Sequence, residues 1–226
     1  MGAGYGQFCP VAKAMEILDE RWTLLVIREL LAGSAHFNEI RRGVPKMSPA
    51  LLAKRLRNLE RVGIVERTTT GRGTSYTLTA SGQELRPVVE GLGAWGVRWV
   101  GDLGEQDYDP HLLFWDVRRT LPVTAWPPGR TVLAIELDDV ASKVSRWWVV
   151  VAGREVDVCD YDPGYDVVGR LSTSLRVLTA VWRGDRSWPS ALRAGDVVVH
   201  APAEVERQIP GWLGQSSIAQ AVAGVR

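Results

Sequence analysis

The sequence predicts an α+β protein of two domains, a mainly helical one followed by one built around a sheet. Apolar residues recur every three or four positions through most of the first hundred residues, and β-branched runs become frequent after residue 130. The charge also changes sign: residues 1–104 hold 14 Lys and Arg against 10 Asp and Glu, and residues 105–226 hold 13 against 16. Because 226 residues suffice for two modest domains, we expect a boundary after Gly104.

The composition is that of a globular protein, with 46% hydrophobic and 23% charged residues. These values exclude disordered, collagen-like and coiled-coil proteins. The longest apolar stretch, residues 147–152, is far shorter than the roughly 18 residues needed to cross a bilayer, and the N-terminus has no signal pattern. We therefore expect a cytoplasmic protein with no membrane partner. Two cysteines, Cys9 and Cys159, are too few for a disulfide framework.

Helices come first in the chain. The apolar spacing predicts them over residues 11–18, 22–31, 36–42 and 49–61. The last has the clearest ends, because Ser48 is a preferred N-cap residue and Pro49 suits the first helical position. Gly63 ends it.

A hairpin and a long helix follow. Strand-like runs at residues 64–69 and 75–78 predict the hairpin, with a long glycine-flanked tip from Thr70 to Thr74. Thr79 then caps a long helix. Its apolar stripe consists of Leu85, Val88, Leu92, Trp95, Trp99 and Leu103. This stripe is too wide for one small domain to cover.

Four helices, a hairpin and a further helix are the plan of a winged helix-turn-helix domain. At 100° per residue, the fourth helix turns Leu52, Leu56 and Leu59 toward the core. Its opposite side carries Ala50, Lys54, Arg57 and Arg61, with Asn58 beside them. A helix about 10–12 Å wide fits the major groove, so this side is expected to contact double-stranded DNA.

Segment 41–61 is strongly basic, since Glu60 is its one acid. Its basic residues are Arg41, Arg42, Lys46, Lys54, Arg55, Arg57 and Arg61. On charge alone, a solvated surface and a polyanion site are equally good interpretations. With the fold, the expected DNA contacts are Arg41, Arg42, Ser48, Ala50, Lys54, Arg57, Asn58, Arg61 and Arg72. Arg72 would enter the minor groove or grip phosphate from the hairpin tip.

The same elements carry motifs that resemble the HxlR-type transcriptional regulators. In order, these are Cys9-Pro10-Val11, Arg21-Trp22, Phe37-Asn38-Glu39-Ile40-Arg41-Arg42, the helix from Ser48 to Gly63, Tyr76-Thr77-Leu78-Thr79 and Gly82. The resemblance spans about residues 8–99. In family members, the sequence Gly-Gly-Lys-Trp usually leads into the second helix, whereas this chain has Asp19-Glu20-Arg21-Trp22. The hairpin of family members is also often longer.

The resemblance implies a homodimer that binds two related half-sites of an operator. The apolar stripe supports this independently, because a second copy could bury it in an isologous interface. The expected dimer residues are Val11, Met15, Leu85, Val88, Leu92, Trp95 and Trp99. The alternative is that Trp95 and Trp99 pack on the second domain of the same chain.

The resemblance also marks Cys9 as a position that senses redox or electrophile signals in several family members. A helix N-terminus or the nearby Lys13 would favour its thiolate. The equally good alternative is a small buried hydrophobe at the dimer seam. Cys159 is expected to serve packing.

The second half is expected to form an α+β layer. Helices are predicted over residues 110–121, 175–183, 189–194 and 203–213. Strands are predicted over residues 131–137, 145–152, 154–159, 167–172 and 197–200. Gly153 makes a tight turn between two of them.

This region, about residues 106–220, resembles the sterol-carrier-protein-like domain that follows some HxlR-type regulators. The cues are Leu112 to Arg119, Val158-Cys159-Asp160, Asp162-Pro163-Gly164 and Ala191 to Gly195. The resemblance implies a sheet and helices that enclose an apolar cavity.

Seven of the ten tryptophans lie in this half. Aromatic side chains often line small-molecule pockets, so Trp115, Trp148 and Trp182 are candidates for a pocket that takes a hydrophobic effector. The alternative is that the tryptophans fill the core. Trp147 and Trp148 are adjacent on one strand and must face opposite sides.

The sequence offers no catalytic candidates, no metal site and no cofactor motif, since His36, His111 and His200 are scattered. Asp160 and Asp162 are more typical of an Asx turn than of a cation site. We therefore expect a DNA-binding regulator rather than an enzyme. The alternative is a carrier of lipids or other hydrophobic molecules, in which the helix-turn-helix serves mainly for oligomerisation.

Overall fold

The computed structural model describes residues 4–71, 73–101, 103–216 and 219. The chain divides into two compact units, residues 1–92 and 93–226. The division falls inside helix α6 (Arg86–Trp99), ahead of the boundary expected after Gly104. That boundary stays a prediction.

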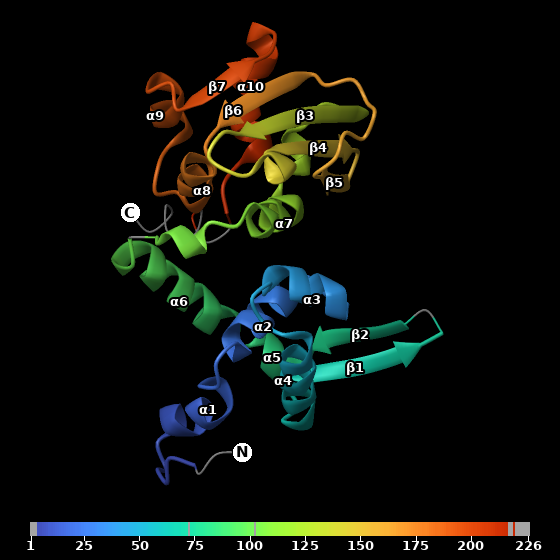
Figure 1. Cartoon of the computed structure of the whole chain (residues 1–226). Coiled ribbons are helices and arrows are strands. Elements are labelled where there is room, and N and C mark those ends of the chain that lie inside the picture. Colours follow the sequence, from blue (N-terminus) through green and yellow to red (C-terminus); the bar gives the residue numbers. More distant parts are fainter. Residues whose placement is uncertain (1–3, 72, 102, 217–218, 220–226) are drawn as a thin grey trace. The chain divides into compact units, whose positions relative to one another are not determined.

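The first unit has the expected order of elements (Figure 1). They are α1 (Pro10–Leu18), α2 (Thr23–Leu31), α3 (Phe37–Gly43), α4 (Pro49–Arg61), β1 (Val65–Thr70), β2 (Gly73–Leu78), α5 (Ala80–Gln83) and the start of α6. Apolar side chains of α2, α3 and α4 form its core, and the most completely buried are Val26, Ile27, Ile40, Leu52 and Leu56. By contrast, every residue of α1 is exposed or half-buried.

The ends of α4 confirm the predicted cap. Ser48 Oγ accepts the backbone N–H of Leu51 at 3.3 Å, and Pro49 occupies the first helical position. This satisfies one of the N–H groups that a helix leaves without a partner at its start. Gly63 follows the helix with a φ of +76°, a conformation that favours glycine.

Two predictions about the next segment are wrong. The long helix expected after Thr79 is broken into α5 and α6, so Thr79 caps only the short α5. Pro87 explains the break, because proline is well placed in the first turn of a new helix and disrupts a helix interior. The hairpin tip is also shorter than expected, since Thr70 pairs directly with Gly73.

The second unit is built around a five-stranded sheet. Its helices are the end of α6, α7 (Pro110–Thr120), α8 (Leu175–Arg183), α9 (Trp188–Arg193) and α10 (Ala203–Leu213). Its strands are β3 (Arg130–Leu137), β4 (Arg146–Ala152), β5 (Glu155–Cys159), β6 (Gly169–Thr173) and β7 (Val197–His200). They lie in the order β5-β4-β3-β6-β7, with β3 parallel to β6 and the other pairs antiparallel.

The two faces of this sheet differ. Helices α7 to α10 pack on one face around Leu133, Ile135 and Trp147. The other face carries a small apolar cluster that includes Trp148 and Val150. The opposite directions predicted for Trp147 and Trp148 are thus confirmed, as is the hairpin turn between β4 and β5 at Gly153.

Within the described part of the chain, none of the helices is both long and apolar enough to cross a lipid bilayer.

Candidate nucleic-acid interface

Helix α4 of the first unit separates a buried side from an exposed basic side. Leu52, Leu56 and Leu59 are at most 2% exposed and join the core. The opposite side exposes Ser48, Ala50, Lys54, Arg57 and Arg61, with Asn58 half-buried. Among the residues that the structure describes, no ion pair involves Lys54, Arg57 or Arg61. Their charges are therefore not neutralised by the protein itself.

Arg55 departs from the basic surface expected over segment 41–61. It is only 6% exposed, forms an ion pair with Glu20 and donates from Nη2 to the carbonyl of Arg21 at 3.1 Å. Its burial lowers the pKa of the guanidinium. The cause is its position on the helix, three residues after Leu52 and four before Leu59, on the core side. Arg55 thus anchors α4 to the segment before α2.

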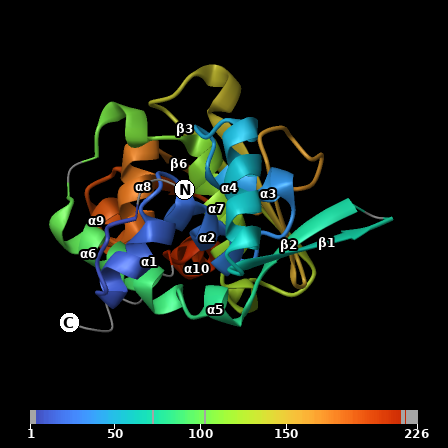
Figure 2. The same cartoon turned by 90° about the horizontal axis from the view of Figure 1, so that it is seen from below.

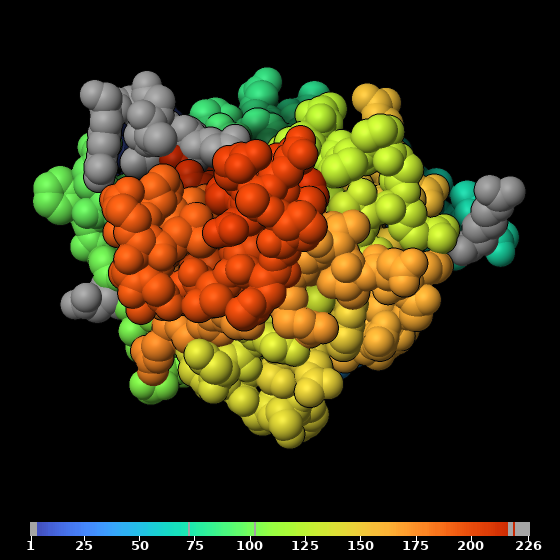
Figure 3. All heavy atoms as spheres, turned by 90° about the horizontal axis from the view of Figure 1, so that it is seen from above, coloured from blue at the N-terminus to red at the C-terminus, as the bar shows by residue number. Residues whose placement is uncertain are grey.

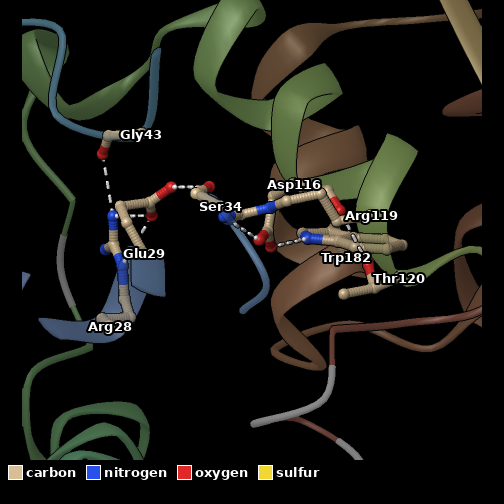
Figure 4. A network of polar contacts seen from close by, with 8 residues as sticks. All are labelled: Arg28, Glu29, Ser34, Gly43, Asp116, Arg119, Thr120 and Trp182. Atoms are coloured by element: carbon tan, nitrogen blue, oxygen red, sulfur yellow. Dashed lines mark hydrogen bonds and ion pairs between the residues drawn. The ribbon is translucent and has the colours of Figure 1, made fainter. Parts of the chain in front are cut away.

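A buried carboxylate fixes the end of α3 (Figure 4). Glu29 is fully buried, and Arg28 donates to it from Nε and Nη2 at 3.1 and 2.8 Å. Arg28 Nη2 also donates to the carbonyl of Gly43 at 2.8 Å. Since Gly43 ends α3, these contacts hold α3 against α2. Arg41 and Arg42, on the last turn of α3, are exposed.

The β1–β2 hairpin is attached to the loop between α2 and α3. Tyr76 N–H donates to the carbonyl of Ala35 at 2.8 Å, and His36 Nδ1 lies 3.1 Å from the carbonyl oxygen of Thr74. The hairpin extends beyond the helices of this unit, as Figures 1 and 2 show. Arg72 lies outside the described residues. Arg67 is an exposed basic residue on β1 that is not among the predicted DNA contacts, although strand alternation points to it.

Cys9 is half-buried at the N-cap of α1. Lys13, which was expected to favour its thiolate, places its Nζ 2.9 Å from Glu16 Oε1. That hydrogen bond lowers the pKa of the Glu16 carboxyl. Farther along, Trp22 has a φ of +80°, which no other non-glycine residue in the described part of the chain shares. The backbone is thus strained where α1 leads into α2.

Most of the predicted dimer residues have exposed side chains. Val11, Met15, Val88, Leu92, Trp95 and Trp99 are between 38% and 69% exposed. Leu85 differs, because it packs against the core of the first unit. Leu103 follows the end of α6 and does not continue its stripe. Bulky apolar groups therefore remain accessible on both α1 and α6.

The three tryptophans proposed for an effector pocket lie in separate surroundings. Trp182 faces the core beside a cavity of only about 10 Å³, and donates from Nε1 to Asp116 Oδ2 at 2.9 Å (Figure 4). Trp148 belongs to the cluster on the other sheet face. Trp115 lies 5.4 Å from the guanidinium carbon of Arg119. A space of about 10 Å³ holds one water at most.

The motif around Asp162 in the second unit forms a turn. Asp162 Oδ1 accepts the N–H of Gly164 at 2.8 Å, so the predicted Asx turn is confirmed. In the residues described, no group of three or more His, Cys, Asp and Glu side chains is placed to hold a metal ion.

Comparison with known proteins gives a consistent match over about the first hundred residues. A family model described as HxlR-like helix-turn-helix matches residues 17–103. The uncharacterized HTH-type transcriptional regulator YvaP of Bacillus subtilis is 36% identical over 98 residues, which are 42% of this chain and 91% of YvaP. The HTH-type transcriptional regulator YodB of the same organism is 38% identical over 91 residues, 38% of this chain and 81% of YodB.

Solved structures give similar matches. Reduced YodB is 35% identical, with 42% of this chain and all of that chain covered and a TM-score of 0.38. Quinone-bound YodB is 37% identical, with 40% and 100% covered and a TM-score of 0.36. The reduced form of the redox regulator HypR is 29% identical, with 41% and 95% covered and a TM-score of 0.39.

Proposed function

The chain belongs to the HxlR family of helix-turn-helix transcriptional regulators, and from this premise we propose that it is a sequence-specific regulator that binds operator DNA as a homodimer. The observation that carries the proposal is the exposed side of α4. Lys54, Arg57 and Arg61 lie there on one side of a helix whose other side is held in the core. A helix of this kind fits the major groove, where arginine and lysine read guanine edges and bind phosphate.

The other basic residues act on the DNA backbone. Arg41 and Arg42 lie on α3, the helix before the recognition helix, and in this type of domain that helix crosses the phosphates. Arg72, at the hairpin tip, reaches the minor groove or a phosphate. Ser48, Ala50 and Asn58 complete the contact surface of α4.

The homodimer buries the apolar residues of α1 and α6. Val88, Leu92, Trp95 and Trp99 recur every three or four residues on α6 and are exposed. A surface of this kind is typical of an interface, because large exposed apolar patches are rare on monomeric proteins. In a two-fold dimer the same patch serves both copies.

The regulator responds to a signal through Cys9 or through the second unit. The redox regulator HypR and quinone-bound YodB are relatives whose names point to such signals. Cys9 is half-buried rather than buried, which leaves the residue partly accessible to oxidants or electrophiles. The second unit, a sheet with helices on one face that we propose to be sterol-carrier-protein-like, provides the alternative route through a small apolar effector.

A gel-retardation assay with the DNA upstream of the protein's own coding region tests the proposal. The purified full-length chain should retard this DNA and not a scrambled duplex of equal length. Its affinity should fall steeply between low and physiological salt, because each neutralised phosphate releases counterions. Equal binding to both duplexes would contradict sequence-specific recognition, and binding that salt does not weaken would contradict the contacts of Arg41 and Lys54.

A further inference from the structure

The second unit has an open hollow of about 630 Å³ at the β4–β5 end of its sheet. Its floor is formed by Val150 and Ala152, which project from β4 on the face opposite the helices. Tyr161 and Tyr165, from the segment between β5 and β6, form a wall. The volume lies within the range of small-molecule sites. By contrast, the cavity beside Trp182 in the core is almost completely filled by side chains.

Arg130 gives this hollow a fixed positive group. It is the first residue of β3, and its guanidinium carbon lies 4.2 Å from the ring centroid of Tyr165. In Figure 3, the segment after β5 (amber) lies beside the segment that leads into β3 (lime). The tyrosine orders the guanidinium without neutralising its charge, because a cation–π contact leaves the N–H donors of arginine available.

Arg118, from α7, adds a second positive charge. Its Nε donates to the carbonyl of Val156 at 3.2 Å, at the edge of β5. Among the described residues, neither Arg118 nor Arg130 takes part in an ion pair. Guanidinium groups without a carboxylate partner are strong binding groups for an anion, above all a carboxylate.

The acids of the hollow restrict that anion. Asp157 accepts the N–H of Val158 at its Oδ1, at 2.9 Å, and its Oδ2 lies 3.6 Å from the sulfur of Cys159. These neutral donors leave its negative charge in place, so it opposes an anion that comes close to it. Glu155 stands in the same cross-strand row as Ala152 and Arg130. Two strand spacings, about 9.6 Å, separate it from Arg130. A second negative charge on the ligand would come close to the Glu155 carboxylate and be repelled by it. A ligand with a single negative charge is therefore favoured.

From this arrangement we infer that the hollow binds a small monocarboxylate with an apolar or aromatic body. The carboxylate binds Arg130, with Arg118 raising the local positive potential, and the body covers Val150 and Ala152. Binding of the carboxylate to the hollow does not depend on the proposed function. The inference rests on that function in one respect, namely that the bound carboxylate acts as the effector of a regulator. It differs from the neutral hydrophobic ligand expected for the tryptophan core.

Isothermal titration of the full-length protein without DNA tests the inference. The probe is 4-phenylbutyrate, and its neutral counterpart is 4-phenylbutyramide. The carboxylate should bind with a Kd below about 1 mM, and the amide about tenfold more weakly. Arg130→Met should weaken carboxylate binding about tenfold, and Arg130→Lys should weaken it less. Arg193→Met, at an exposed position on α9 outside the hollow, is the control and should bind as the wild type does.

Three results would overturn the inference: equal binding of acid and amide, no binding of the acid at about 1 mM, or unchanged binding by folded Arg130→Met. Arg130 is exposed, so circular dichroism should show a normally folded variant. A retardation assay on the same samples separates the two proposals. Normal retardation with no carboxylate binding refutes the hollow alone, whereas carboxylate binding without specific retardation refutes the regulator alone.

Discussion

At the scale of single residues, Gly43 is fixed by a neighbour from another helix. A Cβ added to it would lie 1.8 Å from the carboxylate carbon of Glu29, far inside contact distance. The Glu29 side chain cannot move aside, because it is fully buried and hydrogen-bonded to Arg28. The glycine is therefore required for close packing of α3 on α2.

Gly43→Ala should lower the free energy of unfolding of the first unit by about 3 kcal/mol, because it displaces a buried charged carboxylate from its partner. Thermal unfolding followed by circular dichroism measures this. Gly91→Ala is the matched control: it lies in α6 with no atom near its added Cβ, and should be neutral or stabilising by up to about 1 kcal/mol.

Adding Glu29→Ala to Gly43→Ala should restore part of the loss, because it vacates the space that the new methyl group needs. No recovery in the double variant would show that the clash with Glu29 is not the cause.

Cys159 should react slowly with iodoacetamide in the folded protein. Burial raises the pKa of its thiol, and the nearby Asp157 raises it further, so the reactive thiolate is scarce at pH values near the ordinary thiol pKa of about 8.5. Its labelling rate should keep rising with pH beyond that value. Peptide mass spectrometry at several pH values follows Cys9 and Cys159 separately.

The half-buried Cys9 serves as the internal reference, and protein unfolded in guanidinium chloride as the control, where both cysteines should react alike. Faster labelling of Cys159 than of Cys9 in the native protein would contradict the burial argument.

At the scale of elements, α4 and α3 should differ in what they contribute to DNA recognition. Lys54→Ala and Arg57→Ala should each cost roughly 1–3 kcal/mol of operator affinity and relax specificity, if these residues contact bases. Arg41→Ala should weaken binding to every sequence alike and reduce the salt dependence, because a phosphate contact carries no sequence information.

Fluorescence anisotropy with specific and scrambled duplexes measures both effects. Equal losses on every duplex for all three variants would refute base reading by α4. Arg193→Met again provides the control, as a positive charge lost from α9 of the second unit.

Most elements could be predicted because their apolar spacing is a local property. The periodicity located α4 and its cap at Ser48, as well as the strands of the sheet. The apolar pattern does not predict the break between α5 and α6, because the stripe of apolar residues continues through it, although Pro87 signals the break. The charge pattern predicts Arg55 at the surface with the other basic residues of segment 41–61, although its spacing from Leu52 and Leu59 indicates the core.

At the scale of the whole molecule, the exposed apolar residues of α1 and α6 predict association. Size-exclusion chromatography with light scattering should give a dimer at micromolar concentration. Trp99→Glu should shift it to a monomer, because it places a charge in the apolar interface and Trp99 is 68% exposed in the single chain.

Val198→Glu, at an exposed apolar position of β7, is the control and should leave the dimer intact. A monomeric wild-type protein would contradict the dimer, and a dimeric Trp99→Glu variant would place the interface elsewhere.

The candidate site was predictable only in part. A helical wheel at 100° per residue predicts which side of α4 is exposed and which residues face away from Leu56. No pattern in the sequence predicts the hollow beside Arg130, whereas the tryptophan content points to Trp182. Tryptophan content does not distinguish a filled core from a lined pocket, and only packing shows that the space beside Trp182 is almost filled.

The sequence by itself determined the order of the elements, the caps and the side of α4 that carries free positive charge, because each depends on residues a few positions apart. The tertiary structure decided which distant groups meet: Glu29 with Gly43, Arg55 with Glu20, and Arg130 with Tyr165. These pairs are brought together by the packing of helices and the register of strands. Neither can be read from local periodicity, because contact between remote segments depends on how the whole unit fills its core.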